Sequence, residues 1–233
     1  MKYRHIKKGI FRERHNRFVA RVEVEGKEYT VHVKNTGRCR ELLVPGATVF
    51  LEYDPDAAKK GRKTQYSLVA VYKGGLLINM DSQAPNDAAE EWLTGGGFER
   101  ETGLKPEGIH REVTYGQSRF DLAFTVGERQ AFMEIKGVTL ERDGTALFPD
   151  APTQRGVKHL QELARAAQEG VAAYVLFVIQ MKGVERFLPN EEMHKEFAQA
   201  LGAAKKAGVK ILAYDCRVEE NGFVIDQKVP VNL

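Results

Sequence analysis

The apolar run from Val171 to Ile179 limits the fold of this 233-residue chain more than any other feature. It is far shorter than the roughly 20 residues of a membrane-spanning helix, so it predicts a buried strand. A helical pattern over 153–169 precedes it and ends at Gly170, a residue type typical of helix C-termini. That pattern places four apolar residues on one face: Val157, Leu160, Ala164 and Ala167. A helix packed between two strands in this way predicts a mixed sheet with helices on its faces.

The chain changes composition at Ser82–Asn86, and we expect a domain boundary near residue 84. Beyond it a helix at Asp87–Leu93 is followed by elements in the order β-β-β-α-β-α-β. We expect these elements at 111–117, 119–126, 130–140, 153–169, 171–180, 191–207 and 209–215. The predicted domains are therefore 1–83 and 84–233.

Short strands with period-two alternation fill the first eighty residues. Phe18–Val24 and Tyr29–Val33 flank Glu25-Gly26-Lys27, which predicts a hairpin. Three more β-rich runs follow, at 47–53, 66–72 and 76–78. Five or six short strands predict an OB-fold-like barrel, and the whole chain is then a two-domain α+β protein.

The two predicted domains differ in charge. Residues 1–83 hold 17 Lys/Arg against 9 Asp/Glu (+8), whereas residues 84–233 hold 18 against 23 (−5). A basic barrel beside an acidic domain favours the binding of a polyanion such as DNA, with RNA as the alternative. The candidate DNA-binding cations in the barrel loops are Arg38, Arg40, Arg62 and Lys63. Three tyrosines complete a mixture typical of OB-type nucleic-acid binders, although they also suit a barrel core: Tyr29, Tyr53 and Tyr66.

A second hairpin carries the chemistry. Strands 119–126 and 130–136 are joined by Gly127-Glu128, which fits a two-residue turn with glycine first. Residues then pair where their numbers sum to 255, so Asp121 lies opposite Glu134 with Cβ atoms about 5 Å apart. Lys136 lies on the face of Glu134, because side chains alternate along a strand.

Two opposed carboxylates on partly buried strands repel each other, and a divalent cation compensates that repulsion. We expect Mg²⁺ or Mn²⁺ between Asp121 and Glu134, with Lys136 acting on the attacking water beside a scissile phosphate. The predicted reaction is phosphodiester hydrolysis. An ordinary cross-strand ion-pair cluster on a solvated face is the alternative.

Further candidates surround this hairpin. Glu112 is the preferred third carboxylate, with the helix acids Glu90 and Glu91 as alternatives, and Gln180 approaches from a neighbouring strand. Cations near the start of the 153–169 helix suit phosphate binding. The candidates of this kind are Arg155, Lys158 and His159, with a solvated helix face as the alternative. Arg119, on the 119–126 strand, is a further candidate DNA-binding cation.

The Asp, the gap and the Glu-x-Lys resemble the PD-(D/E)xK nuclease motif. The segments 111–121, 134–140 and 147–160 resemble the sugar fermentation stimulation protein A (SfsA) family, as do Asn35-Thr36-Gly37-Arg38, 41–46 and 62–66. Lys34 and Cys39 depart from the Pro and Met expected beside that first motif. The resemblance implies an N-terminal OB-fold, a nuclease-like C-terminal domain, and DNA binding linked to the regulation of sugar metabolism.

Two functions follow from these observations. The first is a DNA-binding protein with a metal-dependent nuclease site, and the second is a non-catalytic DNA-binding transcriptional regulator of sugar (maltose) metabolism. A small-molecule sugar enzyme is disfavoured because no nucleotide-binding glycine loop is present. Cys39 and Cys216 have no zinc-ligand spacing and suit two free thiols. The charged N-terminus predicts no secretion signal, so we expect a cytoplasmic protein, with no membrane contact and with homodimerisation left open.

Overall fold

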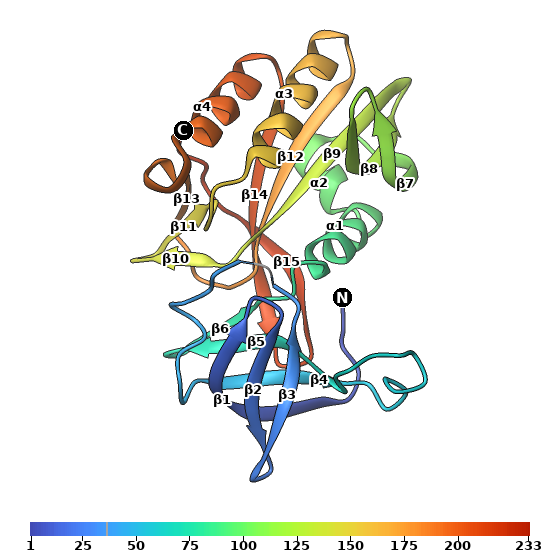
Figure 1. The fold of residues 1–233 in the computed structure, drawn as a ribbon. Helices are drawn as coiled ribbons and strands as arrows, with labels where there is room; N and C mark the ends of the chain where they lie inside the picture. The colour runs from blue at the N-terminus through green and yellow to red at the C-terminus, as the bar shows by residue number, and fades with distance from the viewer. Residues whose placement is uncertain (36) are drawn as a thin grey trace.

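The protein is a two-domain α+β structure, as predicted. The computed structural model describes residues 1–35 and 37–233; Thr36 of the Asn-Thr-Gly-Arg motif lies outside them. Figure 1 shows a small barrel of blue and cyan strands beneath a larger sheet flanked by helices. Within the described part of the chain, no helix is long and apolar enough to cross a membrane.

The N-terminal domain is a five-stranded closed barrel of OB type with one additional strand. Its sheet order is β3-β2-β1-β4-β5-β6, and a parallel pairing of β3 with β5 at His32↔Ser67 closes it. The strands are β1 (Ile6–Asn16), β2 (Val19–Val24), β3 (Lys27–Val33), β4 (Thr48–Tyr53), β5 (Tyr66–Lys73) and β6 (Leu76–Asn79). β1 was not predicted, because Lys7, Lys8 and Arg12 interrupt its apolar alternation.

The C-terminal domain is built on a six-stranded mixed sheet in the order β15-β14-β12-β9-β8-β7. Its strands are β7 (Pro106–Tyr115), β8 (Ser118–Val126), β9 (Arg129–Val138), β12 (Ala172–Ile179), β14 (Lys210–Glu219) and β15 (Gly222–Lys228). β9, β12 and β14 run parallel, while β7–β8–β9 and β14–β15 are antiparallel. The central parallel strand β12 is the apolar run seen in the sequence.

Helices cover both faces of this sheet, which explains why every residue of β12 is buried. Val175, Phe177 and Ile179 pack in the core shared with α3 (Gln154–Gln168) and α4 (Glu191–Lys206). Leu176 and Val178 pack on the opposite side with α1 (Ala84–Thr94) and α2 (Gly97–Thr102). A strand buried on both faces needs no polar alternation.

The register of the β8–β9 hairpin is the predicted one. β8 and β9 pair from Val126↔Arg129 to Leu122↔Met133, so the residue numbers sum to 255. Gly127 has φ +60° at the first turn position, a backbone conformation that favours glycine. Asp121 directly precedes Leu122 and Glu134 directly follows Met133, so both carboxylates lie where the paired part of the hairpin ends.

The face of α3 was predicted only in part. Val157 and Leu160 are buried, but the later turns bury Leu163 and Ala166, whereas Ala164 and Ala167 are only partly buried. The face rotates because Leu163, at one i+3 step from Leu160, offers a larger apolar side chain than the alanine at i+4. Thr153 begins the helix, its hydroxyl accepting the N–H of Gly156 at 3.1 Å.

Several short elements were not predicted, and some of them connect the domains. A three-stranded sheet consists of β10 (Leu140–Arg142), β11 (Thr145–Phe148) and β13 (Arg186–Pro189). At the junction the Asn79 N–H donates to the Gln180 carbonyl at 2.9 Å, and Lys2 pairs with Gly222. The N-terminal segment is thus tied to the C-terminal sheet.

Candidate functional site

Asp121 lies where the β8–β9 ladder opens. Its Oδ2 accepts the main-chain N–H of Ile135 at 2.7 Å, and its Oδ1 accepts the side-chain amide of Asn86 at 3.1 Å. Burial, followed by the negative charge of Glu134, raises the pKa of Asp121 above its ordinary value. Asp121 and Glu134 are therefore electrostatically coupled, as the register predicts.

The carboxylate of Glu134 is buried and unevenly partnered. Its Oε1 lies 2.5 Å from the Lys136 Nζ and 2.5 Å from the His159 Nδ1. Its Oε2 is buried, and no hydrogen-bond donor reaches it from residues 1–35 and 37–233. Burial alone would raise the pKa of Glu134, but the charge of Lys136 and the contact with His159 hold it below the ordinary value. Glu134 is thus an ionised carboxylate with one oxygen unsatisfied.

His159 belongs to this cluster and was predicted only as a phosphate-binding residue. Its ring is buried in α3 and packs edge-on against Phe120, with centroids 6.3 Å apart. Arg155 donates from Nε to the His159 Nε2 at 3.3 Å. Since arginine can only donate, Nε2 is the acceptor and the proton on Nδ1 points to Glu134. Lys158 is exposed on the same helix.

None of the predicted third carboxylates contacts Asp121 or Glu134 in the described part of the chain. Glu90 pairs with Arg111, which also holds Asp87, and Glu91 pairs with the amino group of Met1. The residue of α1 that reaches Asp121 is instead the amide Asn86. A single sequence carries no signal for this, because it depends on how the first turn of α1 packs on β8.

Glu112 is directed toward the surface of the edge strand β7. It has φ +55°, and its carboxylate pairs with Arg119 at 2.8 Å, both side chains being more than half exposed. The predicted third carboxylate and the predicted DNA-binding cation thus neutralise each other at the rim of the sheet. In the described residues, His, Cys, Asp and Glu form no group of three or more that could hold a metal ion.

Gln180 faces the domain junction. Its side-chain amide donates to the Asn79 Oδ1 at 2.8 Å and to the Asp81 carbonyl at 3.0 Å. A Cβ at Gly137 would collide with the Gln180 Oε1, so the glycine after Lys136 permits this close packing. Gln180 and Gly137 line a polar cavity of about 80 Å³ between the domains. Asn35, Thr139 and Asp150 also line it.

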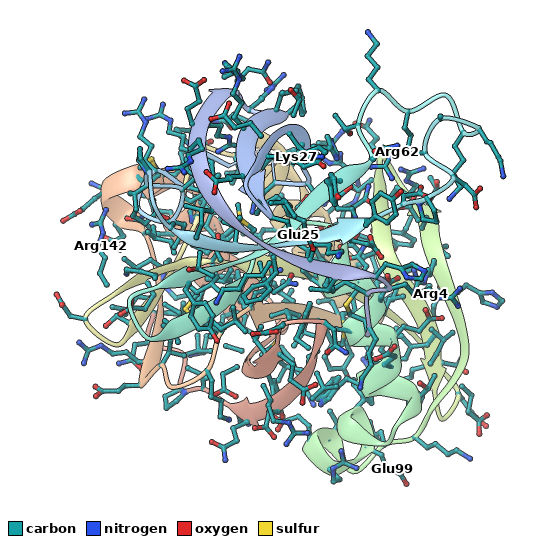
Figure 2. The ribbon with its side chains drawn as sticks, turned by 90° about the horizontal axis from the view of Figure 1, so that it is seen from below. Arg4, Glu25, Lys27, Arg62, Glu99 and Arg142 are labelled. Atoms are coloured by element: carbon teal, nitrogen blue, oxygen red, sulfur yellow. The ribbon has the colours of Figure 1, made fainter. Side chains whose placement is uncertain are left out.

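The predicted barrel cations lie in two separate loops. Arg62 donates to Asp54 at 3.2 Å and to Ser67 at 2.7 Å, and Lys63 is exposed beside it. Figure 2, viewed from below, shows Arg62 on the loop that projects beyond β4. Arg38 and Arg40 are exposed in the segment after β3.

The three tyrosines of the barrel form one aromatic cluster. Tyr66 is buried, with its ring centroid 5.1 Å from that of Tyr29 and 5.2 Å from that of Tyr53. Tyr29 and Tyr53 are partly buried against the barrel core. The tyrosines therefore contribute to the core, the alternative that the sequence left open.

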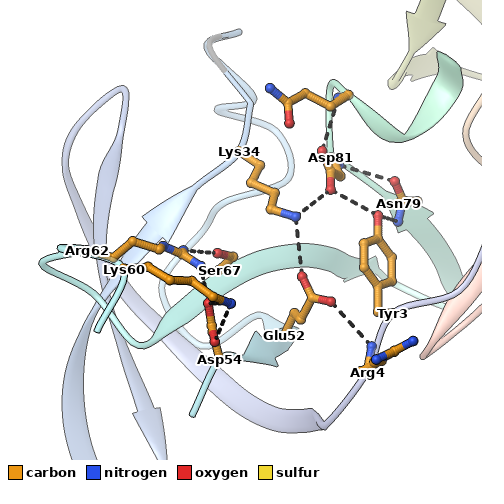
Figure 3. A network of polar contacts seen from close by, with 11 residues as sticks. Tyr3, Arg4, Lys34, Glu52, Asp54, Lys60, Arg62, Ser67, Asn79 and Asp81 are labelled. Carbon is orange, nitrogen blue, oxygen red and sulfur yellow. Dashed lines mark hydrogen bonds and ion pairs between the residues drawn. The ribbon is translucent and has the colours of Figure 1, made fainter. Parts of the chain in front are cut away.

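Lys34 and Cys39, which depart from the family pattern, both have structural roles. Figure 3 shows the Lys34 ammonium between Asp81 and Glu52, at 3.0 and 3.3 Å. Cys39 is buried and free, like Cys216, and burial raises its thiol pKa to about 12. Neither residue contacts Asp121, Glu134 or Lys136 in the described contacts.

The fold and the carboxylate cluster define a class of protein: an OB-type barrel joined to a mixed-sheet domain with a buried Asp/Glu/Lys cluster. Family models match both halves, as the "SfsA N-terminal OB domain" over residues 13–80 and the "Sugar fermentation stimulation protein RE domain" over residues 83–222. The chain belongs to the sugar fermentation stimulation protein (SfsA) family.

Relatives of similar length support this membership. Sugar fermentation stimulation protein homologs from Desulfitobacterium hafniense strain DCB-2 and Ruminiclostridium cellulolyticum are 52% and 49% identical to the chain. Each matches all of this chain and 99% or 100% of the relative. The structure of Pyrococcus furiosus SfsA in complex with Ca²⁺ superposes with a TM-score of 0.89 at 27% identity, covering 100% of this chain and 98% of that one.

Proposed function

We propose that this protein binds DNA and hydrolyses phosphodiester bonds with Mg²⁺ or Mn²⁺ held by Asp121 and Glu134. The observation that carries the proposal is the buried Glu134 Oε2, which has no donor among the described residues while Oε1 has two. A buried ionised oxygen without a partner is costly, so such atoms are expected to have a ligand or a function.

The donor set fits a hard divalent cation. Asp121 and Glu134 are both carboxylates, and the raised pKa of Asp121 reflects burial and repulsion that a cation would relieve. With two protein carboxylates, water and phosphate oxygens would complete the coordination, as is usual for Mg²⁺. The related Pyrococcus furiosus protein, whose structure is described as a Ca²⁺ complex, supports a cation site in this family.

The remaining residues position these two carboxylates. Asn86 and the Ile135 N–H hold Asp121, while His159, itself oriented by Arg155, holds the Oε1 of Glu134. A bound cation would polarise a phosphate oxygen and lower the pKa of a coordinated water. Lys136, whose side chain is 17% exposed, supplies the ammonium group available to stabilise charge on the phosphate in the transition state.

The rival function is a non-catalytic DNA-binding regulator of sugar (maltose) metabolism, favoured by the family's description as sugar fermentation stimulation proteins. It requires the barrel but gives no role to the unsatisfied Glu134 oxygen. The expected compartment for either function is the cytoplasm, where DNA is accessible.

The test is a cleavage assay with Mn²⁺ on linear, nicked, single-stranded and branched DNA. We expect cleavage of at least one form, its loss with chelator, and its loss in Glu134→Gln prepared identically. Asp56→Asn, on an exposed loop, is the matched acid-to-amide control and should cleave like the wild type. DNA binding without metal-dependent cleavage of any form would support the regulator instead.

A further inference from the structure

A basic groove on the barrel has arginines on several sides. It has a volume of about 390 Å³ and is lined by Arg14, Arg17, Arg38 and Arg40, with Asn16 and Leu43. Acidic side chains are absent from its described lining. In the ion pairs formed within 1–35 and 37–233, none of these four arginines has a carboxylate partner. The groove therefore concentrates positive charge: Asp150 acts on Arg38 from outside the lining, but no described carboxylate lies within ion-pair distance of the four arginines.

Arg14 builds the wall of this groove. Its guanidinium donates to the main-chain carbonyls of Asn35 at 2.8 Å, Gly37 at 2.9 Å and Arg38 at 2.6 Å. It also donates to the Arg17 carbonyl at 2.7 Å, so it ties the β1–β2 turn to the segment after β3. With its donors used in this way, Arg14 fixes the backbone that presents Arg38 and Arg40.

An exposed aromatic ring lies next to the groove. Phe18 is 43% exposed, and the Arg17 guanidinium lies 4.8 Å from the centroid of its ring. A large apolar side chain at the tip of a hairpin gains nothing from that exposure in the free protein. A guanidinium backed by an aromatic ring is a surface on which nucleic-acid bases stack.

The groove is connected to the candidate catalytic site. A Cβ at Gly37 would collide with the Asp150 carboxylate, so the segment that carries Arg38 packs closely against Asp150. Asn35 and Asp150 line the same small cavity as Gly137, the residue after Lys136. The segment that carries Arg38 thus lies between the groove and the strand that bears Glu134 and Lys136.

The Arg62 loop lacks these properties. Arg62 is paired with Asp54, as is Lys60, so two of the loop's cations are neutralised. In Figure 1 this loop projects beyond β4 at the right of the barrel, whereas the segment after β3 runs at its left, toward β10. Arg38 and Arg40, by contrast, form no ion pair among the described residues, and their segment lies nearer the candidate site. Of the two barrel loops whose cations were predicted to bind DNA, this one is therefore favoured.

We infer that this groove binds the backbone of an unpaired DNA strand, with Arg38 and Arg40 on successive phosphates and a base stacked at Arg17 and Phe18. The inference rests on the proposed function, and it specifies the substrate as DNA with a single-stranded segment. The bases of a duplex are stacked inside the helix and cannot stack on Phe18. The Phe18 ring should therefore favour single-stranded over duplex DNA.

Fluorescence anisotropy tests this with the full chain, a labelled thymidine 20-mer and a 20-base-pair duplex, in chelator so that cleavage plays no part. We expect tighter binding of the single strand. The Arg38→Ala/Arg40→Ala double variant should weaken it at least tenfold and reduce the slope of log affinity against log salt by about 1.4, or about 0.7 per lost phosphate contact. Phe18→Ala should weaken single-strand binding about fivefold or more and leave duplex binding unchanged.

Arg21→Ala is the matched cation control, because Arg21 is exposed on the same barrel but lies near Glu13 and Glu28. It should bind both probes like the wild type. Unchanged affinity in the double variant would overturn the groove assignment, and equal loss on both probes in Phe18→Ala would overturn the preference for an unpaired strand. The anisotropy experiment contains chelator, so it measures binding without cleavage. If binding depends on the groove but the protein cleaves no DNA in the Mn²⁺ assay, only the proposed hydrolysis is overturned.

Discussion

Two buried acids, Asp81 at the domain junction and Glu134 in the C-terminal sheet, are each 2% exposed, but they are partnered differently. Asp81 Oδ2 accepts hydrogen bonds from the Lys34 Nζ at 3.0 Å and the Tyr3 hydroxyl at 3.3 Å, and Oδ1 accepts one from the Gln83 N–H at 3.0 Å (Figure 3). Glu134 has two donors on one oxygen and, in the described residues, none on the other. The two carboxylates are equally buried, but only Asp81 has a hydrogen-bond donor on each oxygen. This difference marks Asp81 as a structural acid and Glu134 as one suited to binding a ligand.

The two clusters also differ in the expected effect of removing the acid. Removing the Asp81 carboxylate would leave Lys34, 23% exposed, and Tyr3 without their shared partner. Replacing Glu134 would deprive Lys136 and His159 of a partner but would also remove an unsatisfied oxygen. The first cluster should therefore control stability and the second activity.

The largest expected effect is on catalysis. Lys136→Ala should lower the rate of Mn²⁺-dependent cleavage about 10²- to 10³-fold, because it removes a positive group that acts on transition-state charge. DNA affinity should stay within twofold, since one partly buried lysine contributes little to a long backbone contact. Single-turnover rates and anisotropy on the same preparations measure both quantities. Parallel losses of rate and affinity would make Lys136 a general DNA contact.

Asp81→Ala should have the largest effect on stability. The free energy of unfolding should fall by about 3 kcal/mol, the scale for breaking a buried ion pair. Specific cleavage by the folded protein should remain near the wild-type value, and urea titration with assays at low urea measures both. Asp56→Ala removes an exposed pair with Lys59 and should change stability by less than about 0.5 kcal/mol. Lost cleavage in folded Asp81→Ala would erase the distinction between the two acids.

His159 should have a smaller effect, exerted through Glu134. His159→Ala should weaken Mn²⁺ binding about tenfold or more, the usual effect of losing a group that orients a metal ligand. His159→Asn, whose amide can replace the Nδ1–H donor, should recover much of that affinity. Isothermal titration with Mn²⁺ compares the three proteins. If both variants bind Mn²⁺ like the wild type, His159 only fills space in α3.

The smallest effect is a gain in stability. Because the pKa of Asp121 is raised in the folded state, its contribution to stability is present at low pH and is lost as pH rises through that pKa. At neutral pH and without metal, Asp121→Asn should therefore melt about 1 to 3 °C higher than the wild type. The difference should vanish in acid, and Mn²⁺ should reverse it by stabilising the wild type more. A lower melting temperature without metal at neutral pH would mean that the charged Asp121 stabilises the fold.

The sequence predicted features set by local rules and missed those set by packing. The two-residue turn at Gly127 fixed the hairpin register, and two-sided burial showed in the unbroken apolar run of β12. The partners of the helix acids could not be predicted, because Glu91 meets the amino group of Met1 from the far end of the chain. His159 lies 25 residues after Glu134, and only the packing of α3 on the sheet brings them together.

The most direct test of the central claim is an anomalous difference map from a crystal soaked in Mn²⁺. We predict a peak at the Asp121–Glu134 pair, with Glu134 Oε2 and an Asp121 oxygen about 2.0 to 2.3 Å from the ion, within the range for small divalent cations on oxygen ligands. At saturating Mn²⁺, a map with no peak at these carboxylates, or with its peak elsewhere, would contradict the assignment of Asp121 and Glu134 as a metal site.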